Sequence, residues 1–285
     1  MKDETALKID LQEVLRERLP NVSRFIPRGL VRWAERTICQ DEMNRIMVDN
    51  RGLEGADFCR GVFRSLDLKY DVHNSGLLPP PDNRRVVFIS NHPLGALDGL
   101  ALIDYVQSRY GGQVWFVVND LLMHVKPLAP VFLPINKFGS QSRSSSVHID
   151  EAFAGNDPII IFPAGLVSRL QKDGRTIRDL EWKKMFVNKS RIYRRDIVPM
   201  YVDAHNSMHF YKVARWRKRL RLKFNIEQIY LPQEIFSLRG GHFSIYAGEP
   251  VPWSALPAAR DAKAFACRMR EYVYSIPRSV SPDND

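Results

Sequence analysis

Beyond residue 85 the chain alternates between short apolar runs and longer amphipathic stretches, which leaves few folds open to it. A strand buried on both faces reads as a short apolar run, whereas a helix packed on a sheet is apolar on one side only. Their alternation is typical of an α/β sheet with helices on its faces, so the predicted fold is a central mixed sheet flanked by helices. We expect strands at Val86–Ser90, Val114–Val118, Val131–Ile135, Pro158–Phe162, Ile197–Val202 and Phe243–Ala247, and a closing helix at residues 257–274.

The first part of the chain has a different pattern. From residue 5 to about 70, apolar residues recur at helical spacing and strand signals are few. A polar, Pro-rich break follows at His73–Arg85. We therefore expect an N-terminal helical segment at residues 1–74 and an α/β domain at residues 75–285.

A basic stripe within the N-terminal segment has two interpretations. Arg28, Arg32 and Arg36 fall on one helix face, beside an apolar face that contains Leu30 and Trp33. A basic amphipathic helix with a tryptophan can lie on an anionic membrane surface. Alternatively, the apolar face packs on the main domain and the arginines are solvated.

The net charge of +10 arises from 42 Lys and Arg residues against 32 Asp and Glu residues. A basic surface attracts phosphate on nucleic acid, on lipid headgroups or on small substrates. Seven of these charges form one basic cluster, at Lys212, Arg215, Arg217, Lys218, Arg219, Arg221 and Lys223, interleaved with Phe210, Tyr211, Trp216 and Phe224. This composition favours an anionic membrane surface, and it also suits a nucleic-acid groove or an acidic acyl carrier protein.

Composition and cysteine usage narrow the class of protein. With 45% apolar and 11% aromatic residues, the chain is not a disordered or fibrous one. Its three cysteines lie far apart without CxxC spacing, which predicts neither a disulfide framework nor a structural zinc site. There is no signal-like N-terminus and no run of about 18 apolar residues. We expect a protein of the reducing cytoplasm whose membrane contact is peripheral.

A histidine and an aspartate follow the first apolar strand, in Asn91-His92-Pro-Leu-Gly-Ala-Leu-Asp98-Gly. Ligands of open α/β sheets gather at the carboxyl ends of strands. On one continuous helix the two residues would lie about 240° apart around the axis. We therefore place His92 in the loop and Asp98 in the first helical turn, with Gly95 shaping the bend. An Asp that orients an imidazole gives an acid–base dyad, although a structural His that caps the helix is the alternative.

Further blocks accompany this motif, Phe162-Pro163-Ala-Gly165-Leu-Val-Ser168-Arg169 at the end of a later strand and Ile197-Val-Pro further on. In this order, they resemble the glycerolipid acyltransferases, the family of 1-acylglycerol-3-phosphate and related lysolipid acyltransferases. The resemblance covers roughly residues 75–250. The motif His-Pro-Leu-Gly-x-Leu-Asp-Gly is similar to that of a bacterial subgroup that O-acylates lyso-lipids, including lyso-ornithine and lyso-glycine lipids.

The chain departs from the family pattern at several positions. Five residues separate His92 from Asp98 where the family has four, and Ala164 replaces a glutamate of the third block. The position of a phosphate-binding arginine corresponds best to Lys137, a point charge that cannot form a two-pronged contact with phosphate. These changes favour a lyso-lipid acceptor other than lysophosphatidate, and a 1-acylglycerol-3-phosphate acyltransferase is the alternative.

The resemblance implies a mechanism and a set of site residues. His92, oriented by Asp98, would remove the proton from the acceptor hydroxyl as it attacks the thioester of acyl carrier protein or acyl-CoA, without a metal or other cofactor. Residues expected to contact substrate are Asn91, Lys137, Pro163, Gly165, Ser168 and Arg169. Lys137 and Arg169 would hold the anionic head of the acceptor, Pro163 and Gly165 would shape a loop whose N–H groups face the site, and Ser168 is equally a helix cap.

The basic surface also indicates where in the cell the protein is expected and which alternative classes of function fit it. We expect a peripheral enzyme at the cytoplasmic face of the cell membrane, without a nucleic-acid partner. The alternatives from another class are a basic nucleic-acid-binding α/β protein and a catalytically inactive lipid-binding domain.

Overall fold

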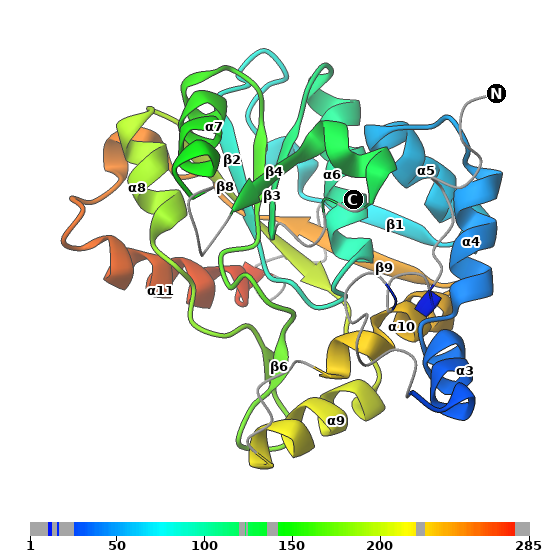
Figure 1. Cartoon of the computed structure of the whole chain (residues 1–285). Helices are drawn as coiled ribbons and strands as arrows, with labels where there is room; N and C mark the ends of the chain where they lie inside the picture. Colours follow the sequence, from blue (N-terminus) through cyan, green and yellow to red (C-terminus); the bar gives the residue numbers. More distant parts are fainter. Residues whose placement is uncertain are drawn as a thin grey trace.

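The computed structural model describes residues 26–119, 125–135, 142–220 and 226–276, with residues 11, 12, 16 and 123, and for 142–146, 218 and 226 the main chain only (Figure 1). Within this part of the chain, seven strands form a mixed sheet in the order β1-β9-β8-β2-β5-β3-β4. Its strands are β1 Lys69–His73, β2 Val86–Ser90, β3 Trp115–Asn119, β4 Phe132–Ile135, β5 Ile159–Ile161, β8 Asp196–Asp203 and β9 His242–Ala247. Two further strands, β6 Arg169–Leu170 and β7 Ile177–Arg178, form an antiparallel hairpin.

The predicted α/β architecture and all six predicted strands are confirmed. Strands β8, β2, β5, β3 and β4 are mutually parallel, and β9 pairs antiparallel with β8. The carboxyl ends of the parallel strands therefore meet at one edge, where ligands of such sheets bind.

Strand β1 is a correction to the predicted N-terminal helical segment. Residues 69–73 extend the sheet by pairing parallel with β9, so the sheet begins before the predicted boundary at residue 74. This strand lies at the edge of the sheet, and none of its residues is fully buried. The predicted strands are mostly continuous apolar runs, whereas Lys-Tyr-Asp-Val-His alternates polar and apolar residues, which is the pattern of a half-buried strand. The division of the chain into two domains stays a prediction.

Helices cover both faces of the sheet (Figure 1). Along β2, Val86 and Phe88 pack into one core and Val87 and Ile89 into the other, as the two-residue period of a strand requires. The α-helices are α3 Arg28–Thr37, α4 Gln40–Asp49, α5 Gly55–Leu66, α6 Leu97–Tyr110, α7 Ser142–Ala154, α8 Met185–Ile192, α9 Met208–Arg219, α10 Leu231–Ser237 and α11 Ala262–Val273, and the 3-10 helices are η2 Ser75–Leu77, η4 Lys126–Val131, η5 Ile226–Tyr230 and η6 Trp253–Ala255. Helices α5 and α6 belong to the first core, α8 and the predicted closing helix α11 to the second.

Helices α3 and α9 lie at the same end of the molecule, at the bottom of Figure 1. Helix α3 contacts η5, and η5 contacts α9, so η5 links the two basic helices. On α3, Leu30 is 53% and Trp33 48% exposed. The interpretation that this apolar face packs on the main domain is therefore wrong for these two residues.

The prediction that the aromatic residues of the basic cluster belong to a binding surface is corrected for two of them. Phe210 and Tyr211 are fully buried, whereas Trp216 on the same helix is 61% exposed. Phe210 and Tyr211 pack with Val167 in a small core of their own. Arg221, Lys223 and Phe224 lie outside the described residues.

Candidate active site

The catalytic dyad predicted from the sequence is assembled in the structure. Strand β2 ends at Ser90, His92 lies in the following loop, and Asp98 lies in the first turn of α6. The Nδ1 atom of His92 lies 3.0 Å from Oδ2 of Asp98. An imidazole that donates from Nδ1 to a carboxylate keeps Nε2 as a proton acceptor, and so the pair has the geometry of an oriented general base.

The carboxylate of Asp98 is itself held in place. It is fully buried, and it accepts the N–H groups of Leu94 and Gly99, each at 2.9 Å. Hydrogen bonds from main-chain N–H groups satisfy a buried carboxylate and fix its orientation. The side chain of His92, by contrast, keeps 13% of its surface exposed.

Gly95 accommodates the extra residue between His92 and Asp98. Its φ of +82° lies in the left-handed region, which glycine adopts without steric cost. A Cβ at this position would lie 2.8 Å from Cδ2 of Leu231 and 3.1 Å from Cγ2 of Val167. The loop therefore bends tightly against α10 while the dyad keeps its hydrogen bond.

An aromatic ring fixes the plane of the imidazole. Phe162, the first residue after β5, stacks on His92 with ring centroids 4.0 Å apart and planes 16° apart. Phe116 of β3 packs edge-on against Phe162. Neither contact uses a ring nitrogen, so the stack restricts rotation of the imidazole without blocking Nε2.

The loop that follows Phe162 also lies beside His92. Gly165, with a φ of +65°, lines a cavity together with His92. Its N–H is donated to the carbonyl oxygen of Phe162, and the carbonyl oxygen of Pro163 accepts the N–H of Lys183. The turn itself thus uses the Gly165 N–H, and the expectation that other N–H groups of this loop face the site stays a prediction.

Two residues predicted to contact substrate form hydrogen bonds that connect elements of the fold. Asn91 is buried and exchanges hydrogen bonds with the main chain of Val202 on β8, at 2.9 and 2.7 Å. Ser168 is also buried, and its N–H is donated to the carbonyl oxygen of His92 at 2.8 Å. The Oγ of Ser168 donates to Asp179, a residue that the sequence analysis did not identify. A single aspartate in a polar loop gives no recognisable signal.

Arg169 lies in β6 within a buried ion-pair cluster. Its Nη2 donates to Oε1 of the fully buried Glu227 at 2.8 Å, and Nε of Arg217 lies 2.9 Å from the second oxygen of Glu227. Desolvation on burial lowers the pKa of the Arg169 guanidinium. Its Nη1 is buried with no hydrogen-bond partner in the described part of the chain. Lys137 lies outside the described residues.

An apolar cavity of about 430 Å³ extends from the dyad into the core on the α5 and α6 face of the sheet. His92, Gly95 and Gly165 line it together with Gln228. Most other lining residues are apolar, and they include Met43, Ile46, Met47, Phe58, Val62, Ile103, Phe116 and Phe132. In the sequence these residues have the same pattern as core residues, so the cavity could not be predicted.

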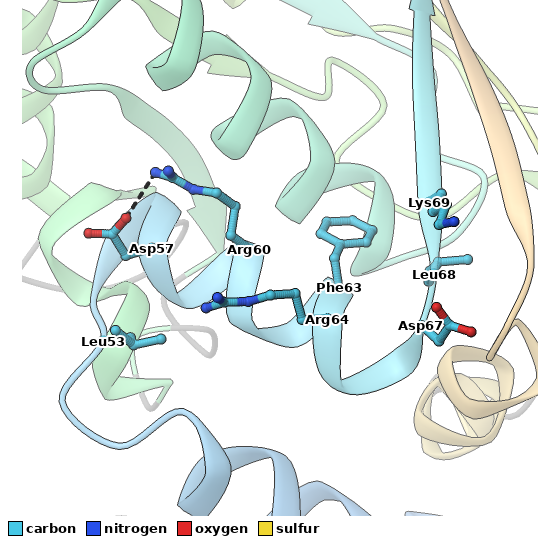
Figure 2. Close-up of a pocket in the computed structure, with 8 residues that line it drawn as sticks. All are labelled: Leu53, Asp57, Arg60, Phe63, Arg64, Asp67, Leu68 and Lys69. Atoms are coloured by element: carbon cyan, nitrogen blue, oxygen red, sulfur yellow. Dashed lines mark ion pairs between the residues drawn. The ribbon is translucent and has the colours of Figure 1, made fainter.

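A second, more open groove of about 500 Å³ lies along the outer side of α5 (Figure 2). Arg60, Arg64 and Lys69 line it with Asp57 and Asp67. Arg60 is paired with Asp57, as Figure 2 shows, and also with Asp104. None of the motif residues lines this groove, and its charges of opposite sign lie side by side.

The described residues contain no group of three or more His, Cys, Asp or Glu side chains that could hold a metal ion. Among their helices, none has the length and apolar character needed to cross a membrane.

Comparison with known proteins places the molecule among enzymes that transfer acyl groups. A family model described as Acyltransferase matches residues 13–281, and the chain belongs to this family. It is similar to two proteins named lyso-glycine lipid O-acyltransferase. One, from Phocaeicola vulgatus, is 39% identical over 276 residues, which cover 97% of this chain and 98% of the relative. The other, from Bacteroides thetaiotaomicron, is 37% identical over 276 residues, which cover 97% of this chain and 100% of the relative.

A solved structure also resembles the chain. The 1-acyl-sn-glycerophosphate (LPA) acyltransferase PlsC from Thermotoga maritima aligns with 95% of this chain and 97% of its own, at 14% sequence identity and a TM-score of 0.48. The fold assignment rests on the strand order described above. The predicted membership of the lysolipid acyltransferases is thus confirmed by the family model and by the two curated relatives.

Proposed function

We propose that this protein is a lyso-lipid O-acyltransferase whose acceptor is a lyso-glycine lipid. The observation that carries the proposal is the His92 imidazole, held by Asp98 and Phe162 at the wall of an apolar cavity. The names of the two relatives, which align over nearly the whole chain, support glycine lipid as the acceptor class.

The proposed reaction is a direct transfer. The acceptor hydroxyl donates its proton to Nε2 of His92 as its oxygen attacks the carbonyl carbon of an acyl thioester. The tetrahedral intermediate then expels the thiolate of CoA or acyl carrier protein, which takes the proton back from Nε2. The new ester bond replaces the thioester bond, and Asp98 stabilises the imidazolium that exists between the two steps.

The cavity is the proposed site of an acyl chain. A chain with its carbonyl group beside His92 extends into the space lined by Met43, Ile46 and Phe58. Transfer of its methylene groups from water to this lining is favourable by about 0.8 kcal/mol each. We assign the anionic headgroup to Arg169 and Lys137, as the family resemblance implies.

The exposed surfaces of α3 and α9 are the proposed membrane-docking face. We define this face by Arg28, Leu30, Arg32, Trp33 and Arg36 of α3 and by Lys212, Arg215 and Trp216 of α9, all of which are wholly or largely exposed. Basic residues attract anionic headgroups, while Leu and Trp side chains enter the interface between headgroups and acyl chains. We propose binding at the cytoplasmic face of the cell membrane, where a lyso-lipid acceptor is located.

Acceptor choice is tested with purified protein. Lyso-glycine lipid and lysophosphatidate are supplied separately, each with acyl-CoA and with acyl carrier protein carrying the same acyl chain. We expect O-acylated glycine lipid as the main product, detected by mass spectrometry, and the comparison also identifies the donor. Robust transfer to lysophosphatidate alone would contradict the proposal and support a 1-acylglycerol-3-phosphate acyltransferase.

Docking is tested by vesicle flotation. We expect binding to vesicles with anionic lipid, loss of binding as salt increases, and no retention of RNA or DNA under the same conditions. Retention of nucleic acid without vesicle binding would support the alternative class of basic binding protein.

A further inference from the structure

A buried carboxylate lies behind the catalytic loop, and the proposed reaction does not use it. Asp179 is fully buried and accepts three hydrogen bonds. The donors are Oγ of Ser168 at 2.5 Å, Nε1 of Trp182 at 2.8 Å and the main-chain N–H of His92 at 3.2 Å. Burial raises the pKa of this carboxyl group. A carboxylate taken out of water destabilises the fold unless such donors compensate, so its presence beside His92 calls for a role.

The contacts of Asp179 close a ring around the main chain of His92. The N–H of His92 is donated to Asp179, and the carbonyl oxygen of His92 accepts the N–H of Ser168. The Oγ of Ser168 in turn donates to Asp179. Ser168 and Asp179 directly precede β6 and follow β7, so the base of this hairpin holds both main-chain polar groups of the catalytic histidine.

Asp179 is itself anchored from another element. Its N–H is donated to the hydroxyl of Tyr274 at 2.7 Å, and its carbonyl oxygen accepts from the guanidinium of Arg270 in α11. Its position is therefore set by the C-terminal helix, which packs on the opposite face of the sheet from the cavity. Asp98 and Phe162 fix the imidazole ring, but neither fixes the main chain from which the ring extends.

We propose that Asp179 is a positioning residue, which fixes the main chain of His92 so that Nε2 reaches the acceptor hydroxyl. The inference rests on the proposed role of His92 as the base. A shift of about 1 Å in a reacting group can cost about 100-fold in rate. Loss of the Asp179 contact therefore lowers the rate of the chemical step more than it lowers substrate binding.

The test compares Asp179→Asn with Trp182→Phe, using lyso-glycine lipid and the better acyl donor. Both substitutions disturb the same buried cluster, but only the first weakens the acceptor for the His92 N–H. For Asp179→Asn we expect kcat to fall about 10- to 100-fold with KM within about twofold of wild type. For Trp182→Phe we expect a comparable decrease in melting temperature, with kcat within about twofold.

Four outcomes overturn the inference or separate it from the proposed function. Wild-type kcat in folded Asp179→Asn, or an equal loss of kcat in Trp182→Phe, shows that Asp179 is only structural. If Asp179→Asn does not fold, Ser168→Ala decides: a kcat about fivefold lower at unchanged KM supports the inference, and an unchanged kcat refutes it. In the same assay, an active His92→Ala variant refutes the proposed base instead.

Discussion

The loop around His92 and the proposed membrane-docking face on α3 and α9 differ in how their polar groups are held. In the loop, the imidazole, the Asp98 carboxylate and the main chain of His92 each have defined partners within 3.2 Å. On the docking face, Arg28, Arg32 and Arg36 project into solvent.

The difference reflects two kinds of recognition. Proton transfer depends on a geometry fixed to within fractions of an ångström, which buried and fully bonded groups provide. A fluid membrane has no fixed geometry to match, so mobile charges suffice, each contributing about 1 kcal/mol. We therefore expect single substitutions to have large effects on turnover in the loop and small ones on the docking face.

The largest effect is expected for His92→Ala. Loss of the general base should lower kcat about 1,000-fold on detergent-dispersed substrate, while the circular dichroism spectrum and melting temperature stay near those of wild type. The exposed His148 of α7 provides the control, since His148→Ala should retain full activity. Near-normal turnover of His92→Ala would remove the dyad from the mechanism.

Asp98→Asn should have the next largest effect, with a kcat about 100-fold lower. The N–H groups of Leu94 and Gly99 bond different oxygens of Asp98, so the amide keeps an oxygen acceptor for only one of them, and it cannot stabilise an imidazolium as a carboxylate does. Steady-state kinetics measure this change, and Asp71→Asn at the exposed pair with His242 is the matched control. A loss no larger than that of the control would show that the bond to Asp98 is not catalytic.

A substitution in the cavity should have an intermediate effect that depends on the acyl chain. Val62→Phe fills space in the cavity lining, so transfer from a long-chain donor should fall about 10-fold while transfer from a short-chain donor is retained. Val106→Phe overpacks the same core without lining the cavity, and it should lower stability without changing chain preference. Equal chain preferences in both variants would place the acyl chain elsewhere.

The smallest effect on turnover is expected for the docking face. Replacing Arg28, Arg32 and Arg36 together by Gln should leave kcat in detergent within about twofold of wild type. The same variant should bind anionic vesicles at least about 10-fold more weakly in flotation assays. Undiminished vesicle binding would place the docking surface on another face.

The sequence predicted those parts of the site that depend on local rules. His92 and Asp98 follow a strand with a strong apolar signal, and helix geometry alone places one in the loop and the other in the first turn. The pairing of Ser168 with Asp179 depends on a tertiary contact. Nothing in the chain between these two residues indicates that the hairpin brings them together.

The sequence contains a local signal for the burial of Phe210 and Tyr211, although the surrounding basic residues make it hard to recognise. Together with Ala214, they fall on one side of α9 and are buried. Positions three and four apart form one stripe of a helix, so this apolar face could be recognised among the basic residues. The edge strand β1 also had a local signal, because Lys-Tyr-Asp-Val-His alternates polar and apolar residues, and Tyr70 and Val72 pack against the core.

Binding of an acyl chain in the apolar cavity, as proposed, would also make the stability of the fold depend on the supply of acyl chains. A ligand that occupies the cavity of the folded protein, and has no site on the unfolded chain, raises the free energy of unfolding by about 2.7 kcal/mol when present at 100 times its Kd. The folded population of this enzyme would then follow the supply of acyl chains in the cell. Starved of them, the protein would unfold more often and become a better substrate for proteases.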